Sequence, residues 1–220
     1  MFATPQTGGQ AQPQLDLYLQ ARGSYPTFPA MGNHECTGNT NSNCGANGAD
    51  GITDNYTQFM NGLMQPLGNT TPYYSINVNE TTGAWTAKFV FVAANAWDST
   101  QASWLQATMG QTTTYTFVIR HESSETSGGP PGESGSDGII SQFPYTLLIV
   151  GHTHTYEKSG PREVIVGNGG APLTSSVNYG FGLVTQRTDG AIQFDMIDYQ
   201  TLQPDTSFRF AVNPDGSPAP

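Results

Sequence analysis

Three short runs of the chain are apolar almost throughout, and they constrain its fold more than any other feature. They are "KFVFVAA" (residues 88–94), "TYTFVI" (114–119) and "YTLLIV" (145–150). A strand with one face in water alternates apolar and polar residues, whereas a strand covered on both faces does not. We therefore predict an α/β protein with a mixed, mostly buried sheet flanked by helices, rather than a barrel.

Other patterns predict the elements around these strands. Apolar residues at helical spacing predict helices over residues 13–23, 53–63 and 98–109, with Thr53 and either Asp98 or Ser99 as N-caps. Further strands are expected at 73–78, 85–95, 162–170, 179–187 and 191–200, with hairpins around "NETTG" and "TDG". Residues 25–31 are expected to be a short extended run, and 122–138, rich in Gly, Pro and Ser, a loop.

The charge balance excludes two classes of partner. Seven Lys and Arg stand against 17 Asp and Glu, a formal net charge of −10 over 220 residues. This predicts no nucleic-acid partner and no binding to an anionic membrane. No run approaches about 18 apolar residues, so we expect no membrane span. The polar, Gly- and Pro-rich composition is typical of a secreted or periplasmic protein, and any signal peptide is expected to precede the sequence shown.

Cys36 and Cys44 lie eight residues apart in a polar loop. They are either two free thiols or a local disulfide, and zinc binding by the pair alone is disfavoured because no third ligand is near in sequence. We predict that they pair in an oxidising compartment.

The four histidines of the chain occupy one kind of position. His34, His121, His152 and His154 each follow an apolar run that is expected to be extended. Ligands of helix-flanked sheets collect beyond the carboxyl ends of the strands, so we expect these side chains to converge. Residues two apart in an extended segment project to the same side, and imidazole is a common metal ligand. The sequence therefore predicts a metal site.

Three motifs in this order resemble those of the calcineurin-like metallophosphoesterases. They are "GNHE" (32–35), "FVIRHE" (117–122) and "GHTHTYE" (151–157), followed by "VIVGNGGAP" (164–172). The motifs are most similar to those of purple acid phosphatases and their bacterial relatives. The resemblance implies a layered α/β/β/α-type fold with mixed sheets, with residues 1–200 as a partial domain and 201–220 as a C-terminal extension.

The resemblance also implies residue roles. Asn33, His121 and His152 would bind one metal ion, together with an Asp that bridges both ions in the family, and His154 would bind the second. His34 would contact the phosphate and protonate the leaving oxygen, and Glu35 would support the site. An intact member of the family binds two ions, of Fe, Zn or Mn, and its substrate is a phosphate ester.

The chain departs from the family pattern at its beginning. The family places two Asp-containing motifs before "GNHE", whereas only Asp16 precedes it here, inside a predicted helix. The N-terminal βαβ portion is therefore missing, either because the chain is a fragment or because it is a divergent form. We expect one bound ion rather than two, and poor turnover.

Three functions remain open. The first is hydrolysis of phosphate esters, as in a phosphomonoesterase or acid phosphatase. The second is a single-metal pseudoenzyme or phosphate-binding module without turnover. The third, a mononuclear zinc enzyme with three histidines and a water, ranks last because it gives Asn33 and His34 no role. The oligomeric state, the substrate and the metal are not encoded in a readable way.

Overall fold

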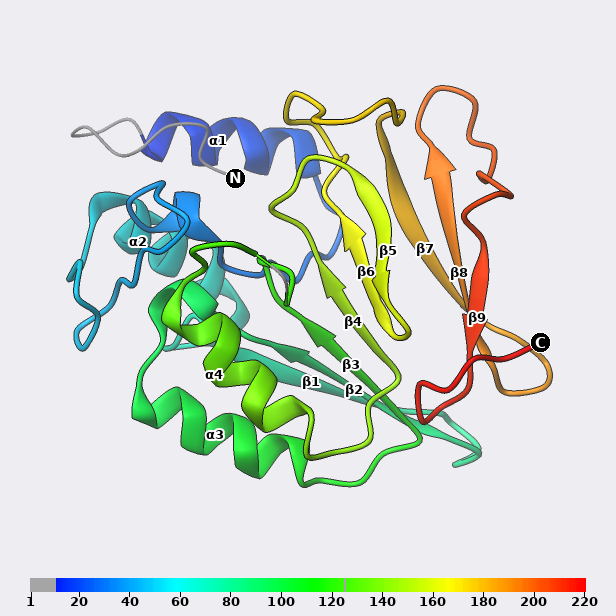
Figure 1. Ribbon diagram of the computed structural model, residues 1–220. Coiled ribbons are helices and arrows are strands. Elements are labelled where there is room, and N and C mark those ends of the chain that lie inside the picture. The colour runs from blue at the N-terminus through cyan, green and yellow to red at the C-terminus, as the bar shows by residue number, and fades with distance from the viewer. Residues whose placement is uncertain (1–10, 125) are drawn as a thin grey trace.

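The computed structural model describes residues 11–124 and 126–220. The prediction that no signal peptide is visible at the N-terminus concerns residues that lie mostly outside this range. Figure 1 shows a mixed α/β protein. Its elements are α1 (Ala11–Arg22), η1 (Asn33–Glu35), α2 (Asp54–Phe59), η2 (Met60–Met64), η3 (Gln65–Leu67), β1 (Tyr74–Asn79), β2 (Thr86–Phe91), η4 (Ala94–Ala96), α3 (Ser99–Met109), β3 (Tyr115–Ile119), α4 (Pro131–Ile140), β4 (Leu147–Val150), β5 (Tyr156–Gly160), β6 (Glu163–Val166), β7 (Gly180–Gln186), β8 (Ile192–Asp198) and β9 (Phe210–Val212). No helix in this part of the chain is long and apolar enough to cross a membrane.

The larger sheet has six strands in the order β1-β2-β3-β4-β6-β5. The pairs β2-β3, β3-β4 and β4-β6 are parallel, and the edge strands β1 and β5 are antiparallel to their neighbours. The three apolar runs of the sequence form β2, β3 and β4 in the middle of this sheet. The prediction of a mixed sheet with buried central strands is confirmed.

The smaller sheet has three antiparallel strands in the order β7-β8-β9, and it packs against one face of the larger sheet (Figure 1). Phe194 and Met196 of β8 share a buried cluster with Phe117 of β3 and Leu147 of β4. The hairpin predicted around "TDG" is the β7-β8 pair. β9 lies within residues 201–220, which we expected to be an extension, and pairs with β8.

Helices α3 and α4 cover the opposite face of the larger sheet (Figure 1). Leu105 of α3 and Ile140 of α4 pack in one cluster with Val118 of β3 and Leu148 of β4. Apolar side chains therefore cover the central strands on both faces, which explains the absence of alternation in their sequences.

Helices α1 and α2 pack at one end of the larger sheet. Leu15 of α1 and Phe59 of α2 share a cluster with Tyr74 of β1. Asp16, the only acidic residue before "GNHE", is exposed on α1 and accepts a hydrogen bond from Gln12 at 2.7 Å. It lies in a helix, as the sequence predicted.

The prediction of a loop over residues 122–138 is wrong, because α4 begins inside this segment. Two of its glycines are required by close contacts: a Cβ at Gly132 would lie 2.6 Å from the main chain of Ala94, and one at Gly135 would lie 2.7 Å from the Trp97 indole. A proline in the first turn of a helix is compatible with helical geometry. Residues that break a helix in isolation thus allow this one to pack against η4.

Two further segments differ from their prediction. Residues 25–31 belong to no strand, because Pro26 and Pro29 have no N–H to donate to a sheet. β5 was not expected, since its sequence "YEKSG" is polar, yet it pairs with β6 at the edge of the sheet. Because residues 25–31 form no strand, His34 follows a loop.

Candidate functional site

All four histidines line one cleft of about 1010 Å³ beyond the carboxyl ends of β3, β4 and β6. β3 ends just before Arg120 and His121, and β4 ends just before Gly151 and His152. The Gly151 N–H donates to the His121 carbonyl at 2.8 Å, which extends the parallel pairing of the two strands by one step. The predicted convergence of the histidines is confirmed, while the roles assigned to them stay predictions.

Three potential ligand atoms meet at one point of this cleft. His121 Nε2 lies 3.0 Å from Asn33 Oδ1 and 3.2 Å from His152 Nδ1. The two imidazole rings are 5.1 Å apart between centroids and nearly perpendicular, at 85°. An ion with bonds of about 2.1 Å holds neighbouring ligands about 3.0–3.4 Å apart. The spacing and chemistry of these atoms fit a bound metal ion.

A disulfide-closed loop orients two of the three ligands. Cys36 and Cys44 form the predicted disulfide. Inside this loop the Gly38 carbonyl accepts a hydrogen bond from Asn33 Nδ2 at 2.7 Å, so the amide oxygen of Asn33 faces His121. Thr40 Oγ1 lies 3.5 Å from His152 Nε2, on the side of the ring away from His121. Such hydrogen bonds fix which atom a ligand presents to a metal.

The backbone at the site is constrained at two positions. A Cβ on Gly32 would lie 2.5 Å from Cγ of the His121 ring, so only glycine fits there. His152 itself has a φ of 61°, a left-handed conformation that non-glycine residues rarely adopt. The sharp turn of the chain thus lies at His152 rather than at the preceding Gly151. Strained backbone of this kind clusters at functional sites.

His34 lies beside the three ligand atoms without joining them. Its carbonyl accepts a hydrogen bond from Asn55 Nδ2 at 2.7 Å, which fixes the main chain of η1. Its Nδ1 is buried and makes no hydrogen bond in the described structure. Burial lowers the pKa of His34. The neighbouring Glu35 is buried and accepts from the Gly32 N–H at 2.9 Å, which closes the turn that carries His34.

His154 lines the same cleft, close enough to His34 and His152 for its charge to add to the lowering of the pKa of both rings by burial. Its Nδ1 lies 2.8 Å from the Pro172 carbonyl, an acceptor, so this nitrogen carries the proton and Nε2 is the available ligand atom. Across residues 11–124 and 126–220, His154 belongs to no group of three or more His, Cys, Asp or Glu close enough to hold an ion. The structure therefore places one well-formed set of ligand atoms in the cleft.

One residue of the site was missed by the sequence prediction. Glu122 joins His121 and His152 in a group whose ligand atoms all lie within 4.8 Å of one another, and this group can hold a metal ion. Its side chain is completely buried, and burial raises its pKa to about 8. The only signal in the sequence was its place directly after His121, in a segment expected to be a loop.

Burial also decides the charge of the histidine ligands. It lowers the pKa of His121 to about 3 and lowers that of His152 as well. Both rings are therefore neutral near pH 7, and the neutral imidazole is the form that binds a metal ion.

No family model matches this chain, and no curated protein matches it. Inferences about function therefore come from the residues of the cleft. The donor set and its spacing are the features that any proposed activity has to use.

Proposed function

We propose that this protein hydrolyses phosphate esters in a metal-dependent reaction, as a member of the calcineurin-like metallophosphoesterases. One observation carries the proposal: His121 Nε2 lies 3.0 Å from Asn33 Oδ1 and 3.2 Å from His152 Nδ1, in the same cleft as His34 and His154. These are the residues to which the motifs "GNHE", "RHE" and "GHTH" assign roles. The face-to-face packing of the two sheets supports a layered fold of this family.

The cleft lacks the positive side chains that would bind an anionic substrate, so a phosphate ester would need a bound metal ion there. No Lys or Arg is among the residues that line it, and the chain carries a net charge of −10. A phosphate ester is itself an anion and would be repelled by such a protein. A bound ion would supply the missing positive charge and a Lewis-acid centre for the phosphoryl oxygens and the attacking water.

His34 is the proposed proton donor. In the reaction a water oxygen attacks phosphorus, and the bond between phosphorus and the ester oxygen breaks. The water gives up one proton to solvent. His34, in the protonated form that its lowered pKa confines to acid pH, gives one to the leaving oxygen and regains one from solvent. The products are an alcohol and inorganic phosphate. The Asn55 and Glu35 contacts hold His34 in the cleft while its ring stays outside the ligand group.

A second function is favoured by the surroundings of His154. Since one set of ligand atoms is complete and the other is a single histidine, the chain is suited to bind one ion of Fe, Zn or Mn. A single-metal protein that binds phosphate without turnover is the alternative. The disulfide supports a secreted or periplasmic location in either case.

Hydrolysis of p-nitrophenyl phosphate, measured with added Mn²⁺, Zn²⁺ or Fe²⁺ and after chelation, tests the proposal. We expect slow hydrolysis that requires metal. The variant His34→Ala should bind metal normally and lose hydrolysis. Metal and phosphate binding without hydrolysis would favour the phosphate-binding alternative, and hydrolysis that survives both chelation and His34→Ala would contradict the proposal.

A further inference from the structure

Glu122 is a buried carboxylate that the proposed chemistry has not yet used. It follows His121 directly beyond the end of β3, and none of its surface is exposed. Neither of its carboxylate oxygens has a hydrogen-bond partner of ordinary geometry among the described residues. Buried carboxylates are normally paired with a cation or with several donors, because desolvation strongly disfavours an isolated charge.

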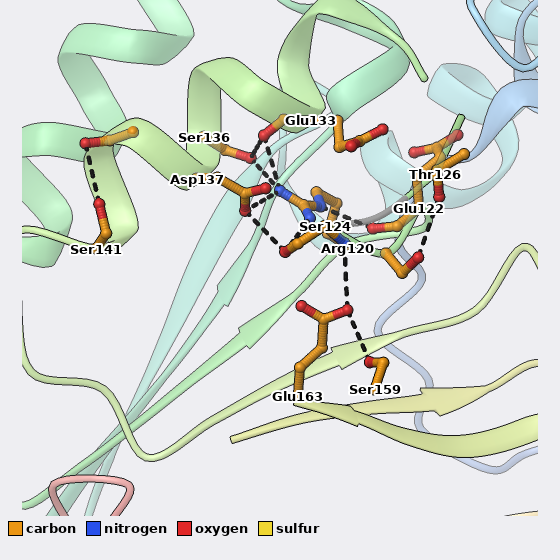
Figure 2. Close-up of polar contacts among 12 residues, drawn as sticks. Arg120, Glu122, Ser124, Thr126, Glu133, Ser136, Asp137, Ser141, Ser159 and Glu163 are labelled. Carbon is orange, nitrogen blue, oxygen red and sulfur yellow. Dashed lines mark hydrogen bonds and ion pairs between the residues drawn. The ribbon is translucent and has the colours of Figure 1, made fainter. Parts of the chain in front are cut away.

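The neighbouring cation, Arg120, attracts this carboxylate without a hydrogen bond to its side-chain oxygens. Arg120 is completely buried, and Figure 2 shows its guanidinium bonded to groups on its other sides. Its hydrogen bonds run to the main-chain oxygens of Glu122 and Glu133, to the hydroxyls of Ser124 and Ser136, and to the carboxylate of Asp137. The contact with Glu122 is therefore to its carbonyl and leaves the side-chain oxygens unpaired.

The nearest amide is also committed elsewhere. Asn95 lies beside Glu122, but its Nδ2 donates to the carbonyls of Thr40 and Ser42, each at 3.1 Å. The Asn95 oxygen is an acceptor and likewise has no partner. Arg120, Asn95 and the main-chain N–H of Glu122 thus attract the carboxylate, but neither of its oxygens has a hydrogen bond of ordinary geometry among the described residues.

The geometry of the adjacent histidines indicates where that charge belongs. His121 Nε2 and His152 Nδ1 are 3.2 Å apart, and an oxygen of Glu122 lies within 4.8 Å of the ligand atoms of both. Around one ion with bonds of about 2.1 Å, two nitrogens at this separation subtend an angle near 100°, which suits tetrahedral and octahedral coordination.

We propose that Glu122 is the anionic ligand of the metal site, together with His121 and His152. This inference rests on the metal-dependent function proposed above and names a ligand that the sequence motifs did not predict. Two imidazoles and one carboxylate form a donor set that binds divalent Fe, Mn and Zn. A divalent ion held by one carboxylate keeps a net positive charge, which a phosphate group needs. Asn33 Oδ1 supplies a neutral fourth ligand.

The same polar cluster contains a matched control. Glu133 is also buried and has one carboxylate oxygen without a partner, but it belongs to no metal-ligand group among the described residues. Figure 2 shows Glu122 and Glu133 in the same cluster around Arg120. A purely structural role for buried carboxylates here predicts similar effects of the two substitutions, whereas a ligand role for Glu122 predicts different ones.

The test is titration of the full chain with Mn²⁺ and with Zn²⁺ by calorimetry, for the wild type, Glu122→Gln and Glu133→Gln. We expect Glu122→Gln to weaken binding by at least about tenfold, since loss of a direct ligand costs no less than loss of its outer hydrogen bond, and Glu133→Gln to change it by less than about twofold. Melting curves supply an independent readout. Glu122→Gln should melt at a higher temperature than the metal-free wild type, because an uncompensated carboxylate is removed, and should lose the rise in melting temperature that metal gives.

Each remaining outcome decides the question. Equal metal affinity of Glu122→Gln and wild type would overturn the proposal and leave the phosphoesterase function standing on Asn33, His121 and His152. If Glu122→Gln binds metal more weakly and the wild type has no hydrolytic activity, Glu122 is supported as a ligand and only the proposed phosphoesterase function is contradicted. Glu122→Met has a similar length and no charge, and it replaces the glutamine variant if that one is unstable. Failure of both variants to fold would overturn the proposal, because it would make the carboxylate a structural group.

Discussion

Two histidines of the cleft, His152 and His154, differ in what surrounds them. His152 lies with His121 beside Asn33 and Glu122, and these potential ligand atoms come from η1, the end of β3 and the end of β4. His154 bonds instead to the Pro172 carbonyl. His152 and His154 are two residues apart in one motif, yet only the first lies among other ligands.

This difference teaches that a His-x-His motif does not by itself define a metal site. His152 joins a group of potential metal ligands because parallel strands bring His121 to the same edge. The Cys36–Cys44 loop holds Asn33 through the Gly38 carbonyl and places Thr40 beside the His152 ring. His154 bonds to the segment that follows β6, where Gly169 and Pro172 line the cleft, whereas Glu35, the acidic residue among those lining it, lies in η1. The asymmetry predicts one strong metal site.

Alanine substitution of each histidine gives the largest expected contrast. His152→Ala removes a ligand from the complete set and should weaken metal binding by more than about 100-fold, beyond the range seen for loss of an orienting neighbour. His154→Ala should change the affinity by less than about twofold. Calorimetric titration with Zn²⁺ measures both, and equal losses in the two variants would remove the asymmetry.

Glycine substitutions beside His121 and in the segment after β6 give the next largest expected difference in metal affinity. Gly32→Ala places a Cβ 2.5 Å from the His121 ring, whereas Gly169→Ala meets no atom within 4 Å. Displacement of His121 should weaken metal binding about 10- to 100-fold, as loss of ligand orientation does elsewhere, and the Gly169 variant should bind like the wild type. Metal titration and thermal melts check both; a Gly32→Ala protein with unchanged affinity would show that the ring is free to move.

The buried groups His121 and Glu122 predict that the free energy of unfolding depends on pH. Burial raises the pKa of Glu122 from 4.5 to about 8, so the folded metal-free protein keeps a proton that the unfolded chain has lost. The contribution of this bound proton to the free energy of unfolding is fully present below pH 4.5 and is lost as the pH rises toward 8. Between pH 6.5 and 8 the loss amounts to on the order of 1.5 kcal/mol, since one pKa unit corresponds to about 1.4 kcal/mol.

Denaturant unfolding of chelated protein at several pH values measures this effect. Glu122→Gln should lack the decrease between pH 6.5 and 8. His121 acts in the opposite direction: its pKa of about 3 lies below the 6.5 of the unfolded chain, so stability is lost as the pH falls through this window. An identical alkaline decrease in wild type and Glu122→Gln would assign it to other groups.

The smallest expected effect belongs to Thr40, which lies 3.5 Å from His152 Nε2. Thr40→Val keeps the shape and removes the hydroxyl, and it should weaken metal binding by up to about tenfold. Thr40→Ser keeps the hydroxyl and should restore the affinity. If both variants bind like the wild type, the loop orients the site through Asn33 alone.

Much of the fold could be predicted from local patterns. The apolar runs gave the central strands of the larger sheet, and turn sequences gave both hairpins, because burial and turn chemistry act over a few neighbouring residues. The meeting of His121 with His152 could be predicted too, since parallel strands end at a common edge. Helix N-caps at Thr53 and Asp98 also form as the sequence predicted.

The parts that escaped prediction depend on contacts between distant segments. In α4, Gly132 and Gly135 allow the helix to pack closely against Ala94 and Trp97. No pattern in the local sequence predicts such contacts. The burial of Glu122 likewise follows from the elements that pack over it, since a charged residue after a strand is usually exposed. The left-handed conformation of His152 is set by its surroundings rather than by its own preference.

The number of metal ions bound per chain tests the central claim most directly. The full chain is equilibrated with Mn²⁺ or Zn²⁺, freed of loosely bound metal and assayed for metal content, with hydrolysis of p-nitrophenyl phosphate measured on the same sample. We predict one ion per chain and slow, metal-dependent hydrolysis. Two tightly held ions with fast hydrolysis would show that His154 has ligands not recognised here, and no bound ion would contradict the metal site itself.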